Sequence, residues 1–460
     1  MTSNPVVLLT TEPPPIPGVP ATGAGLRAWG LLQGLRALGA PDARLLVAAD
    51  AIRGREAAAA PPEGVEFVNR PELDDRIAEL SPRALVFQHW GIMRDLRREP
   101  GCPVAIDLAG PHLLERALWG SKDREGDLVE KLAALHRADF VTCSGAFQRN
   151  YFIAHLAQAG WDPRAADLCP AIPFSLSPEL PEIPADRDNR AFFYGGMFLP
   201  WQDPSAVLRA ALRAVEGDER ARLVFVGGPH PSADVGGGRF DGLLLELRAH
   251  PRVEYHAPMP FPEMVEKMRR CGLALDLMPA NAERLIAFPT RTVAYLWAGV
   301  PPLHNNYDEL AGPIDAAKAG WALDPGDAAG MEELLERALR RPQDTTRRAE
   351  AAQRLAADRY TWDRTTEPLA AWCRDPRRRE RGAAVAVPGA LAAPPPAAEP
   401  TARKRSRAGA VSYTPRTAVT GPGLHAWLLS PIVFLLALPI SLMLVLLFAL
   451  VEIVKRLFRR

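Results

Sequence analysis

The stretch Glu283–Leu303, ERLIAFPTRTVAYLWAGVPPL, combines a proline, a possible helix cap and an apolar run. Pro289 cannot extend a preceding helix, and Thr290 is a residue type that caps helix N-termini. Apolar side chains follow at helical spacing until Gly299 ends the run. The stretch therefore predicts a loop, a short buried helix and the start of a strand.

The predicted helix leaves an N-terminus that could hold a ligand. Its first N–H groups and the helix dipole favour an anion, and Arg291 can bind a phosphate through two parallel hydrogen bonds. The same residues also fit an ordinary capped helix of the core. On this stretch alone, both interpretations stay open.

Strands and helices alternate on both sides of this stretch, which predicts parallel sheets covered on both faces. The expected strands are 6–10, 43–49, 84–88, 103–107 and 139–143, then 190–196, 222–228, 253–256 and 273–278. The Pro-rich segment 179–188 separates the two series and is expected to be a hinge. The fold class is therefore α/β, with two Rossmann-like domains.

Polar residues follow several expected strands, at the edge where open α/β sheets bind ligands. They are His89, Asp107, His112 and Ser144. Each could be an ordinary loop residue. Asp107 and His112, in IDLAGPHLLER, are the better pair, because either side chain could orient a substrate hydroxyl.

A Glu-containing loop, a Pro, a basic residue and a run like YLWAGVPP recur in GT-B glycosyltransferases, and residues 5–373 resemble the retaining family numbered four. The resemblance implies two Rossmann-like domains that face a central cleft. It implies an acceptor domain at 1–182, a nucleotide-sugar donor domain at 183–342, and helices at 343–376 that cross back to the first domain.

The resemblance also implies the site. Glu283 would contact the donor sugar or ribose, and Asp107 or His112 would serve the acceptor, so these three are the predicted catalytic residues. The donor's nucleotide diphosphate would be bound by Gly23, Gly25, Gly196, Arg284, Thr290, Arg291 and Thr292. A retaining transferase of this kind needs no protein nucleophile.

Three positions depart from the family pattern. Ala294 stands where a second glutamate is usual, and Met197 and Gln202 stand where the family places Arg and Lys. Two phosphate-neutralising charges are therefore missing, and Arg291 with Arg284 would have to supply them. Two alternatives follow: a catalytically degenerate binding or scaffold protein, and a nucleotide-sugar epimerase.

Composition narrows the class of protein further. Five cysteines are scattered without CxxC pairing, and no paired-carboxylate DxD loop is present, so we expect neither disulfides nor a metal. We expect no cofactor either, because the nucleotide sugar would be a substrate. The N-terminus lacks a basic, apolar secretory signal. A cytoplasmic body follows as the expectation.

The formal charge of +1 conceals two unlike parts of the chain. Residues 376–460 hold thirteen Lys or Arg against three Glu, a charge of +10, which leaves −9 for the body. An acidic body argues against nucleic acid as a partner, and a basic tail suits anionic lipid.

The tail also predicts a membrane anchor. Residues 377–423 are rich in Pro, Ala and Arg and are expected to form a disordered linker. Residues 424–454 contain an uncharged run, 424–451, long enough to cross a hydrocarbon layer of roughly 30 Å, and 455–460 form a basic end. Pro431 and Pro439 leave open a re-entrant hairpin as well as a single span.

Together these observations predict a metal-independent glycosyltransferase at the cytoplasmic face of the inner or plasma membrane. It would move a sugar from a nucleotide diphosphate donor to a lipid-linked or glycan acceptor, in the biosynthesis of a surface polysaccharide or glycolipid. The sugar, the base and the linkage do not follow from the sequence.

Overall fold

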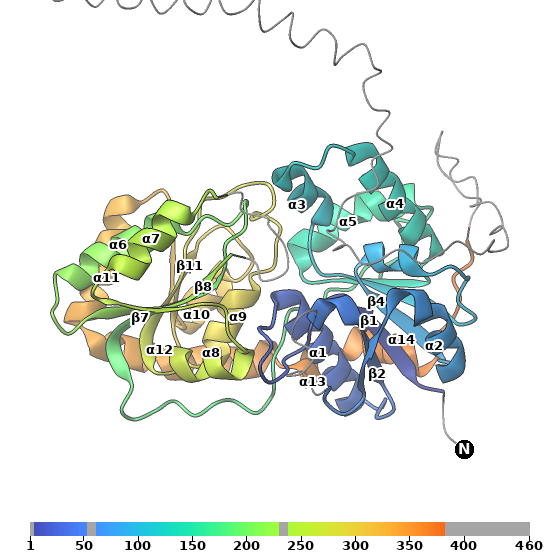
Figure 1. The fold of residues 1–460 in the computed structure, drawn as a ribbon, viewed down its shortest axis with the longest axis horizontal. Coiled ribbons are helices and arrows are strands. Elements are labelled where there is room, and N and C mark those ends of the chain that lie inside the picture. The colour runs from blue at the N-terminus through green and yellow to red at the C-terminus, as the bar shows by residue number, and fades with distance from the viewer. Residues whose placement is uncertain (1–3, 53–60, 230–237, 382–460) are drawn as a thin grey trace, which may run out of the picture. The chain divides into compact units, whose positions relative to one another are not determined.

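The computed structural model of the protein describes residues 4–52, 61–229 and 238–381, which form two α/β lobes (Figure 1). The first lobe has a parallel sheet in the order β3-β2-β1-β4-β5-β6. Its strands are β1 (Val6–Thr10), β2 (Arg44–Ala48), β3 (Val65–Val68), β4 (Ala84–Gln88), β5 (Val104–Leu108) and β6 (Phe140–Cys143).

Helices cover both faces of this sheet. They are α1 (Gly23–Ala37), α2 (Leu73–Leu80), α3 (His112–Trp119), α4 (Arg124–Arg137) and α5 (Ala146–Gln158), with 3-10 turns η1 (Ala49–Ile52), η3 (Arg70–Glu72) and η4 (Trp90–Asp95). Along β1, Val6 and Leu8 join one apolar cluster, and Val7 and Leu9 join another. Alternate side chains of a strand point to opposite faces, so a fully apolar strand needs a helix layer on each face.

The second lobe repeats this architecture with the sheet order β12-β11-β10-β7-β8-β9. Its strands are β7 (Asp188–Met197), β8 (Arg222–Gly228), β9 (Val253–His256), β10 (Cys271–Asp276), β11 (Pro302–Asn305) and β12 (Trp321–Leu323). Its helices are α6 (Ser205–Glu216), α7 (Asp241–Ala249), α8 (Phe261–Met268), α9 (Thr290–Trp297), α10 (Ala311–Ala317) and α11 (Ala328–Arg340). The prediction of two parallel-sheet α/β domains is confirmed.

Both sheets reverse their strand order at the central pair, β1 with β4 in the first lobe and β7 with β10 in the second. At such a reversal the connections leave the sheet in opposite directions and open a crevice at the carboxyl ends of the strands. The carboxyl ends of these two central pairs are therefore where the fold itself favours a ligand.

The C-terminal helices join the two lobes. In α12 (Pro342–Arg359), Ala352 and Leu355 pack in the apolar cluster around α9 of the second lobe. The chain then returns to the first lobe, where α13 (Trp362–Thr365) and α14 (Glu367–Arg374) lie beside α1 (Figure 1). Leu369 and Ala370 of α14 pack in the same cluster as β1.

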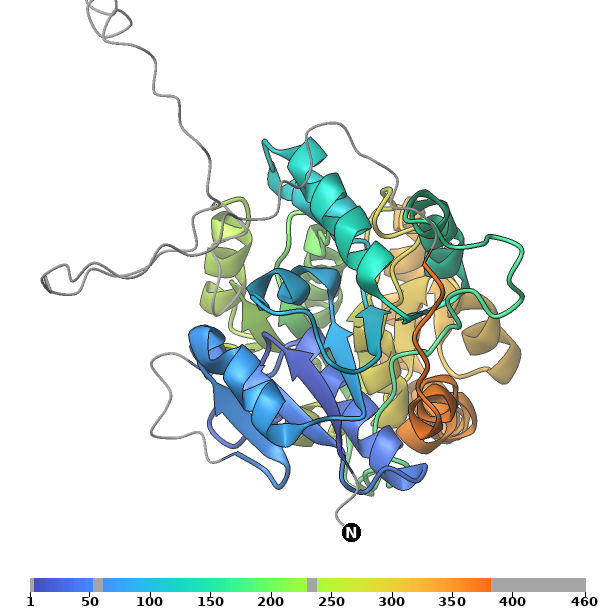
Figure 2. The ribbon, with the colours of Figure 1, turned by 90° about the vertical axis from the view of Figure 1, so that its right-hand side faces the viewer.

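The first residues of the predicted linker are bound to the first lobe, so the prediction of an unstructured segment from residue 377 is wrong for 377–381. The guanidinium group of Arg379 donates to the carbonyls of His136, Ala138 and Gly160 at 3.0, 3.3 and 3.1 Å. Arg381 donates to Arg137 O at 2.6 Å. In Figure 2 this orange segment runs along the first lobe after α14. Carbonyls at the end of α4 lack helical partners, which is why arginines bind there.

The rest of the predicted linker, the membrane segment 424–454 and the basic end 455–460 lie outside the described residues. Within residues 4–52, 61–229 and 238–381, no helix combines the length and the apolar character needed to cross a membrane.

Candidate functional site

The N-termini of two helices meet where the lobes face each other. A Cβ atom on Gly23, the first residue of α1, would lie 3.2 Å from Thr290 Oγ1, at the start of α9. Gly23 and Gly25 belong to the first turn of α1 rather than to the loop before it, and Thr22 caps that turn by accepting from Gly25 N at 3.0 Å.

Gly25 is required by a close approach of the backbone. A Cβ atom at this position would lie 1.8 Å from Pro13 O, in the loop after β1. Only glycine lets that loop fold against the helix start. Because neither predicted glycine carries a side chain, this turn of α1 can lie close to the second lobe and to the loop after β1.

The cap of α9 differs from the prediction. Pro289 takes the N-cap position without a side-chain hydrogen bond, and Thr290 is the first helical residue. Pro289 O accepts from Val293 N at 3.4 Å, so the N–H groups of residues 290–292 precede the first intrahelical bond. A proline cap has no side-chain acceptor, which leaves these donors to other partners.

Arg291 lies between the two central strands of the second sheet. Its guanidinium donates to Asp276 Oδ1 at 2.9 Å and to Gln202 Oε1 at 3.1 Å, and it lies 5.1 Å above the ring of Tyr194. A Cβ atom on Gly196 would lie 2.4 Å from its Nη2 atom. Gly196 at the end of β7 is therefore the residue that makes room for Arg291.

Asp276 is positioned by a buried chain of polar groups. Thr292 Oγ1 donates to Asp276 Oδ2 at 2.5 Å and lies 3.0 Å from Nδ1 of His304, whose Nε2 lies 2.8 Å from Asp308 Oδ1. Burial alone would raise the pKa of Asp276, but the charges of Arg291 and His304 outweigh it and the pKa is lowered. The carboxylate stays ionised and fixes the arginine.

Glu283 and Arg284 form an ion pair within one turn, residues 282–286. Arg284 donates to both carboxylate oxygens of Glu283, at 2.6 and 3.0 Å. Asn281 Oδ1 accepts from both backbone N–H groups at 3.0 Å and holds the turn. Burial raises the pKa of Glu283 although Arg284 opposes it. Each predicted phosphate-binding arginine thus already has a carboxylate partner.

Asp107 lies in the interior of the first lobe. It is fully buried on β5, and Arg27 of α1 binds its two oxygens at 2.6 and 2.7 Å, while Thr142 donates at 2.7 Å. The structure therefore gives Asp107 the task of fixing α1 on the sheet. These three bonds engage both carboxylate oxygens away from solvent, and the predicted contact with an acceptor stays a prediction.

His112 is the first residue of α3 and remains partly exposed. Its Nδ1 atom lies 2.7 Å from Oε2 of Glu115, one turn along the helix. Burial raises the pKa of Glu115, but His112 and then Arg284 of the second lobe outweigh it, so the pKa is lowered. These charges connect α3 with the turn 282–286, which lies across from it (Figure 1).

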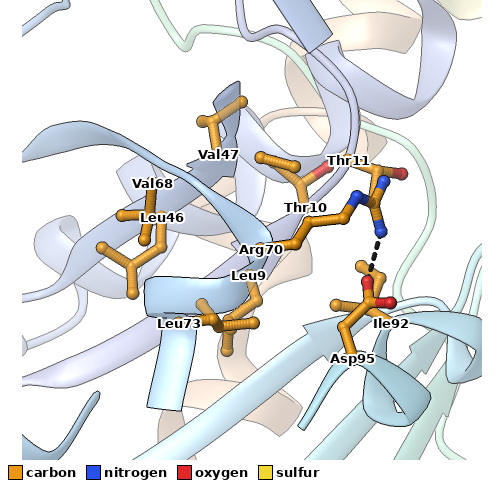
Figure 3. Close-up of a pocket in the computed structure, with 11 residues that line it drawn as sticks. Leu9, Thr10, Thr11, Leu46, Val47, Val68, Arg70, Leu73, Ile92 and Asp95 are labelled. Carbon is orange, nitrogen blue, oxygen red and sulfur yellow. Dashed lines mark hydrogen bonds and ion pairs between the residues drawn. The ribbon is translucent and has the colours of Figure 1, made fainter. Parts of the chain in front are cut away.

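A small pocket lies apart from these residues, in the first lobe (Figure 3). Arg70 and Asp95 form an ion pair at its rim, and Arg70 also binds Asp50 at 3.2 Å. The pocket is lined by Leu9, Thr10, Thr11, Leu46, Val47, Ala48, Val68, Arg70, Leu73, Ile92 and Asp95. No residue predicted from the sequence lines it.

Sequence reasoning missed three residues of the site. Asp276 lies near the end of the expected strand 273–278 and is the last residue of β10, so the rule that ligands bind at carboxyl ends could have indicated it. Glu115 follows His112 by one helical turn, a spacing that brings two side chains together. Gln202 was noted only as a missing charge, since its bond to Arg291 joins residues 89 positions apart.

No family model matches the chain. The D-inositol 3-phosphate glycosyltransferase of Acidothermus cellulolyticus is 26% identical over 205 residues, 43% of this chain and 43% of that protein. The chain thus matches less than half the length of this curated relative.

Among solved structures, sucrose-phosphate synthase from Thermosynechococcus elongatus matches with a TM-score of 0.59 and 15% identity, over 81% of this chain and 98% of that one. Anabaena HepE in complex with UDP and glucose matches with a TM-score of 0.57 and 14% identity, over 80% and 99%. The described lobes therefore have the glycosyltransferase GT-B fold.

Proposed function

We propose that this GT-B protein is a glycosyltransferase that takes its sugar from a nucleotide diphosphate. The observation that carries the proposal is the meeting of α1 and α9, because their N-terminal turns face each other at Gly23 and Thr290. Backbone N–H groups and helix dipoles at such ends favour a diphosphate.

Arg291 would complete the diphosphate site. Asp276 and Met278 Sδ accept from Nη1 and Gln202 accepts from Nη2, whereas its Nε has no partner among the described residues. A guanidinium has five N–H donors, so donors remain for phosphate oxygens without breaking the contact with Asp276. The buried Asp276 would then hold the arginine in place rather than compete for it.

Glu283 and Arg284 would act as one unit. The carboxylate is buried against Arg284, and its charge lies close to Glu115 and His112 of the first lobe. In the proposed reaction Glu283 faces the donor sugar, where a carboxylate stabilises the positive charge of the transition state. A retaining, metal-independent course remains what the family resemblance implies.

The acceptor would lie on the first lobe, beside His112. Asp107 is left out of this role because Arg27 and Thr142 occupy it. The run 424–451 in the sequence supports a membrane-associated acceptor, such as a lipid-linked glycan, and action at the cytoplasmic membrane face.

Calorimetric titration with UDP-glucose, followed by other nucleotide sugars, tests the donor site. HepE, the similar protein above, was crystallised with UDP and glucose, so UDP-glucose is the first donor to try. We expect Arg291→Ala to weaken donor binding by about 1–3 kcal/mol, since a charge-assisted bond to phosphate is lost. Arg209→Ala is the control, because Arg209 is exposed and its ion-pair partner in the described part of the chain is Glu246 on the surface. Equal affinity of both variants would exclude Arg291 from the site.

A catalytically degenerate binding protein is the second candidate. Its support is that Arg284 and Arg291 are each neutralised by a carboxylate, while Ala294 replaces the usual glutamate and is buried in the core. Radiolabelled donor distinguishes the two candidates. Specific binding without transfer or hydrolysis would favour the degenerate protein, and a labelled glycan product would favour the transferase.

A further inference from the structure

His112 is held by a carboxylate on its own helix. The 2.7 Å contact joins Nδ1 of His112 to Oε2 of Glu115 in the first turn of α3. An acidic residue in a first turn often serves only the helix dipole. Here α3 buries none of its residues fully, and Glu115 also faces Arg284 of the second lobe, so the contact belongs to the surface between the lobes.

A second histidine fixes the ring from another direction. The His89 ring meets that of His112 edge to face, with centroids 3.8 Å apart. His89 has a φ of 91°, which side chains other than glycine rarely adopt, and its Nδ1 accepts from Gly91 N at 3.0 Å. Such a strained backbone persists where the surrounding structure enforces it, often at functional sites.

His89 itself is uncharged. Burial, and then the charges of His112 and Lys131, keep the pKa of His89 well below its usual range. Its Nε2 is buried without a partner among the described residues. A neutral ring that accepts at Nδ1 carries its proton on Nε2. His89 is therefore an uncharged ring that packs against the ring of His112.

The contact with Glu115 also determines which nitrogen of His112 is available. A neutral imidazole that donates from Nδ1 to a carboxylate keeps its lone pair on Nε2. His112 interacts electrostatically with Glu115 on α3, Glu12 after β1 and Glu283 on the turn 282–286. His89 is the neutral neighbour. In the neutral form of the ring, Nε2 then accepts a hydrogen bond from a hydroxyl.

We propose that Glu115 is a positioning residue that holds His112 so that its Nε2 accepts a hydrogen bond from the acceptor hydroxyl that receives the sugar. The inference rests on the proposed glycosyl transfer. It assigns His112 the contact with substrate and Glu115 the control of the ring's tautomer and direction.

The test uses the full chain with Glu115→Ala and Glu115→Gln, and Glu125→Gln on the exposed first turn of α4 as the matched control. Transfer kinetics and the nitrogen-15 spectrum of labelled histidines are both measured, with His112→Ala used to assign the signal. We expect Glu115→Ala to lower kcat about 10- to 100-fold with donor KM unchanged. Its His112 signal should lose the pure Nδ1–H tautomer.

Glu115→Gln should lie between the wild type and the alanine variant, because an amide oxygen still accepts from Nδ1–H without the charge. A merely structural Glu115 would leave the tautomer unchanged in every folded variant. Glutamine also serves as the informative variant if alanine unfolds the protein.

The outcomes separate this inference from the proposed function. Normal transfer by the wild type with unchanged kcat in Glu115→Ala would overturn the positioning role and leave glycosyl transfer standing. Failure of the wild type to transfer any sugar would overturn the acceptor role together with the proposed function. An unchanged tautomer in Glu115→Ala overturns the pairing whatever the activity, because that spectrum needs no substrate.

Discussion

Individual ion pairs decide which charged residues of this protein are free to bind a ligand. Arg27 with Asp107, and Arg284 with Glu283, are buried pairs in which two bonds join the guanidinium to the carboxylate. The first pair fixes a helix on a sheet, whereas the second lies where the lobes face each other. Both pairs join an arginine to a carboxylate, so the residue types do not distinguish them. Their different locations in the structure do.

Breaking the first pair should destabilise the protein strongly. We expect Asp107→Ala to lower the free energy of unfolding by about 3–5 kcal/mol, because Arg27 is left charged and buried. Urea unfolding followed by circular dichroism measures this. The double variant Arg27→Met with Asp107→Ala should lose less, since no charge stays unpaired. A loss in Asp107→Ala no larger than in the exposed control Glu246→Ala would contradict the assignment.

Lys131 is a buried amine without a carboxylate partner among the described residues. Its Nζ lies 4.8 and 4.6 Å from the ring centres of Tyr151 and Phe152, and burial lowers the pKa of Lys131 to about 7. The ordinary pKa of a lysine side chain is 10.5, so between pH 10.5 and 7 the unfolded chain binds a proton that the folded protein does not. The folded state is therefore favoured above this window and loses stability as the pH falls through it.

We expect Lys131→Met to remove that dependence. The difference in unfolding free energy between variant and wild type should grow by up to about 1.4 kcal/mol for each pH unit below 10.5 and level off below 7. Methionine keeps the contact with both rings, so the variant should be the more stable protein at pH 7. Denaturant unfolding between pH 6 and 10 measures the difference, and a constant difference would show that Lys131 titrates normally.

A helix N-terminus can receive its hydrogen-bond acceptor from a distant part of the chain. Gly145 caps α5 without a side chain, and the missing acceptor comes from the second lobe, where Glu309 Oε2 accepts from Ala146 N at 2.9 Å. A Cβ atom on Gly145 would lie 1.6 Å from Glu309 Oε1. Glycine here thus admits a carboxylate that joins the lobes.

Glu309→Ala should weaken the contact between the two lobes. We expect it to lower the free energy of unfolding by about 0.5–2 kcal/mol, the usual effect of losing a helix cap. The radius of gyration from small-angle scattering should rise, because the cap acts between lobes. Glu309→Gln should keep part of the effect through its amide oxygen. Glu350→Ala on the exposed face of α12 is the control, and equal scattering from all four proteins would refute an interlobe cap.

The folded part of the chain extends beyond residue 377, where the composition predicts that the linker begins. Residues 377–381 look like the beginning of a basic tail, yet Arg379 also donates its backbone N–H to the buried Asp139 at 3.0 Å. The stretch behaves as part of the first lobe. The charge available to a membrane surface therefore lies beyond it.

Two truncations test this boundary. A chain that ends at Arg381 should be as stable as the full chain, whereas one that ends at Pro376 should lose about 1–3 kcal/mol, because buried carbonyls and Asp139 lose their donors. Thermal unfolding compares them. Both should bind donor, since their donor lobes are intact. Both should also leave the membrane fraction if 424–454 is the anchor, and retention of either there would contradict that assignment.

Local patterns in the amino-acid sequence predicted the fold class. Apolar strands, helical spacing and turn residues are local signals, so they predicted the alternation of strands and helices and the element that carries Arg291. The resemblance built on those residues predicted the two-lobed fold. Local capping was predicted less well, because Thr22 and Pro289 take positions that several neighbouring residues could fill.

Which charged residues are paired depends on contacts between distant parts of the chain. Arg27 and Asp107 are 80 residues apart, and Glu309 meets α5 across 163. Whether such groups pair depends on how sheets and lobes pack, and no local pattern records it. Asp107 therefore looked like a site residue and is a buried anchor, whereas Glu115 looked ordinary and faces the other lobe. Burial and partnership determine the chemistry of a carboxylate, and folding supplies both.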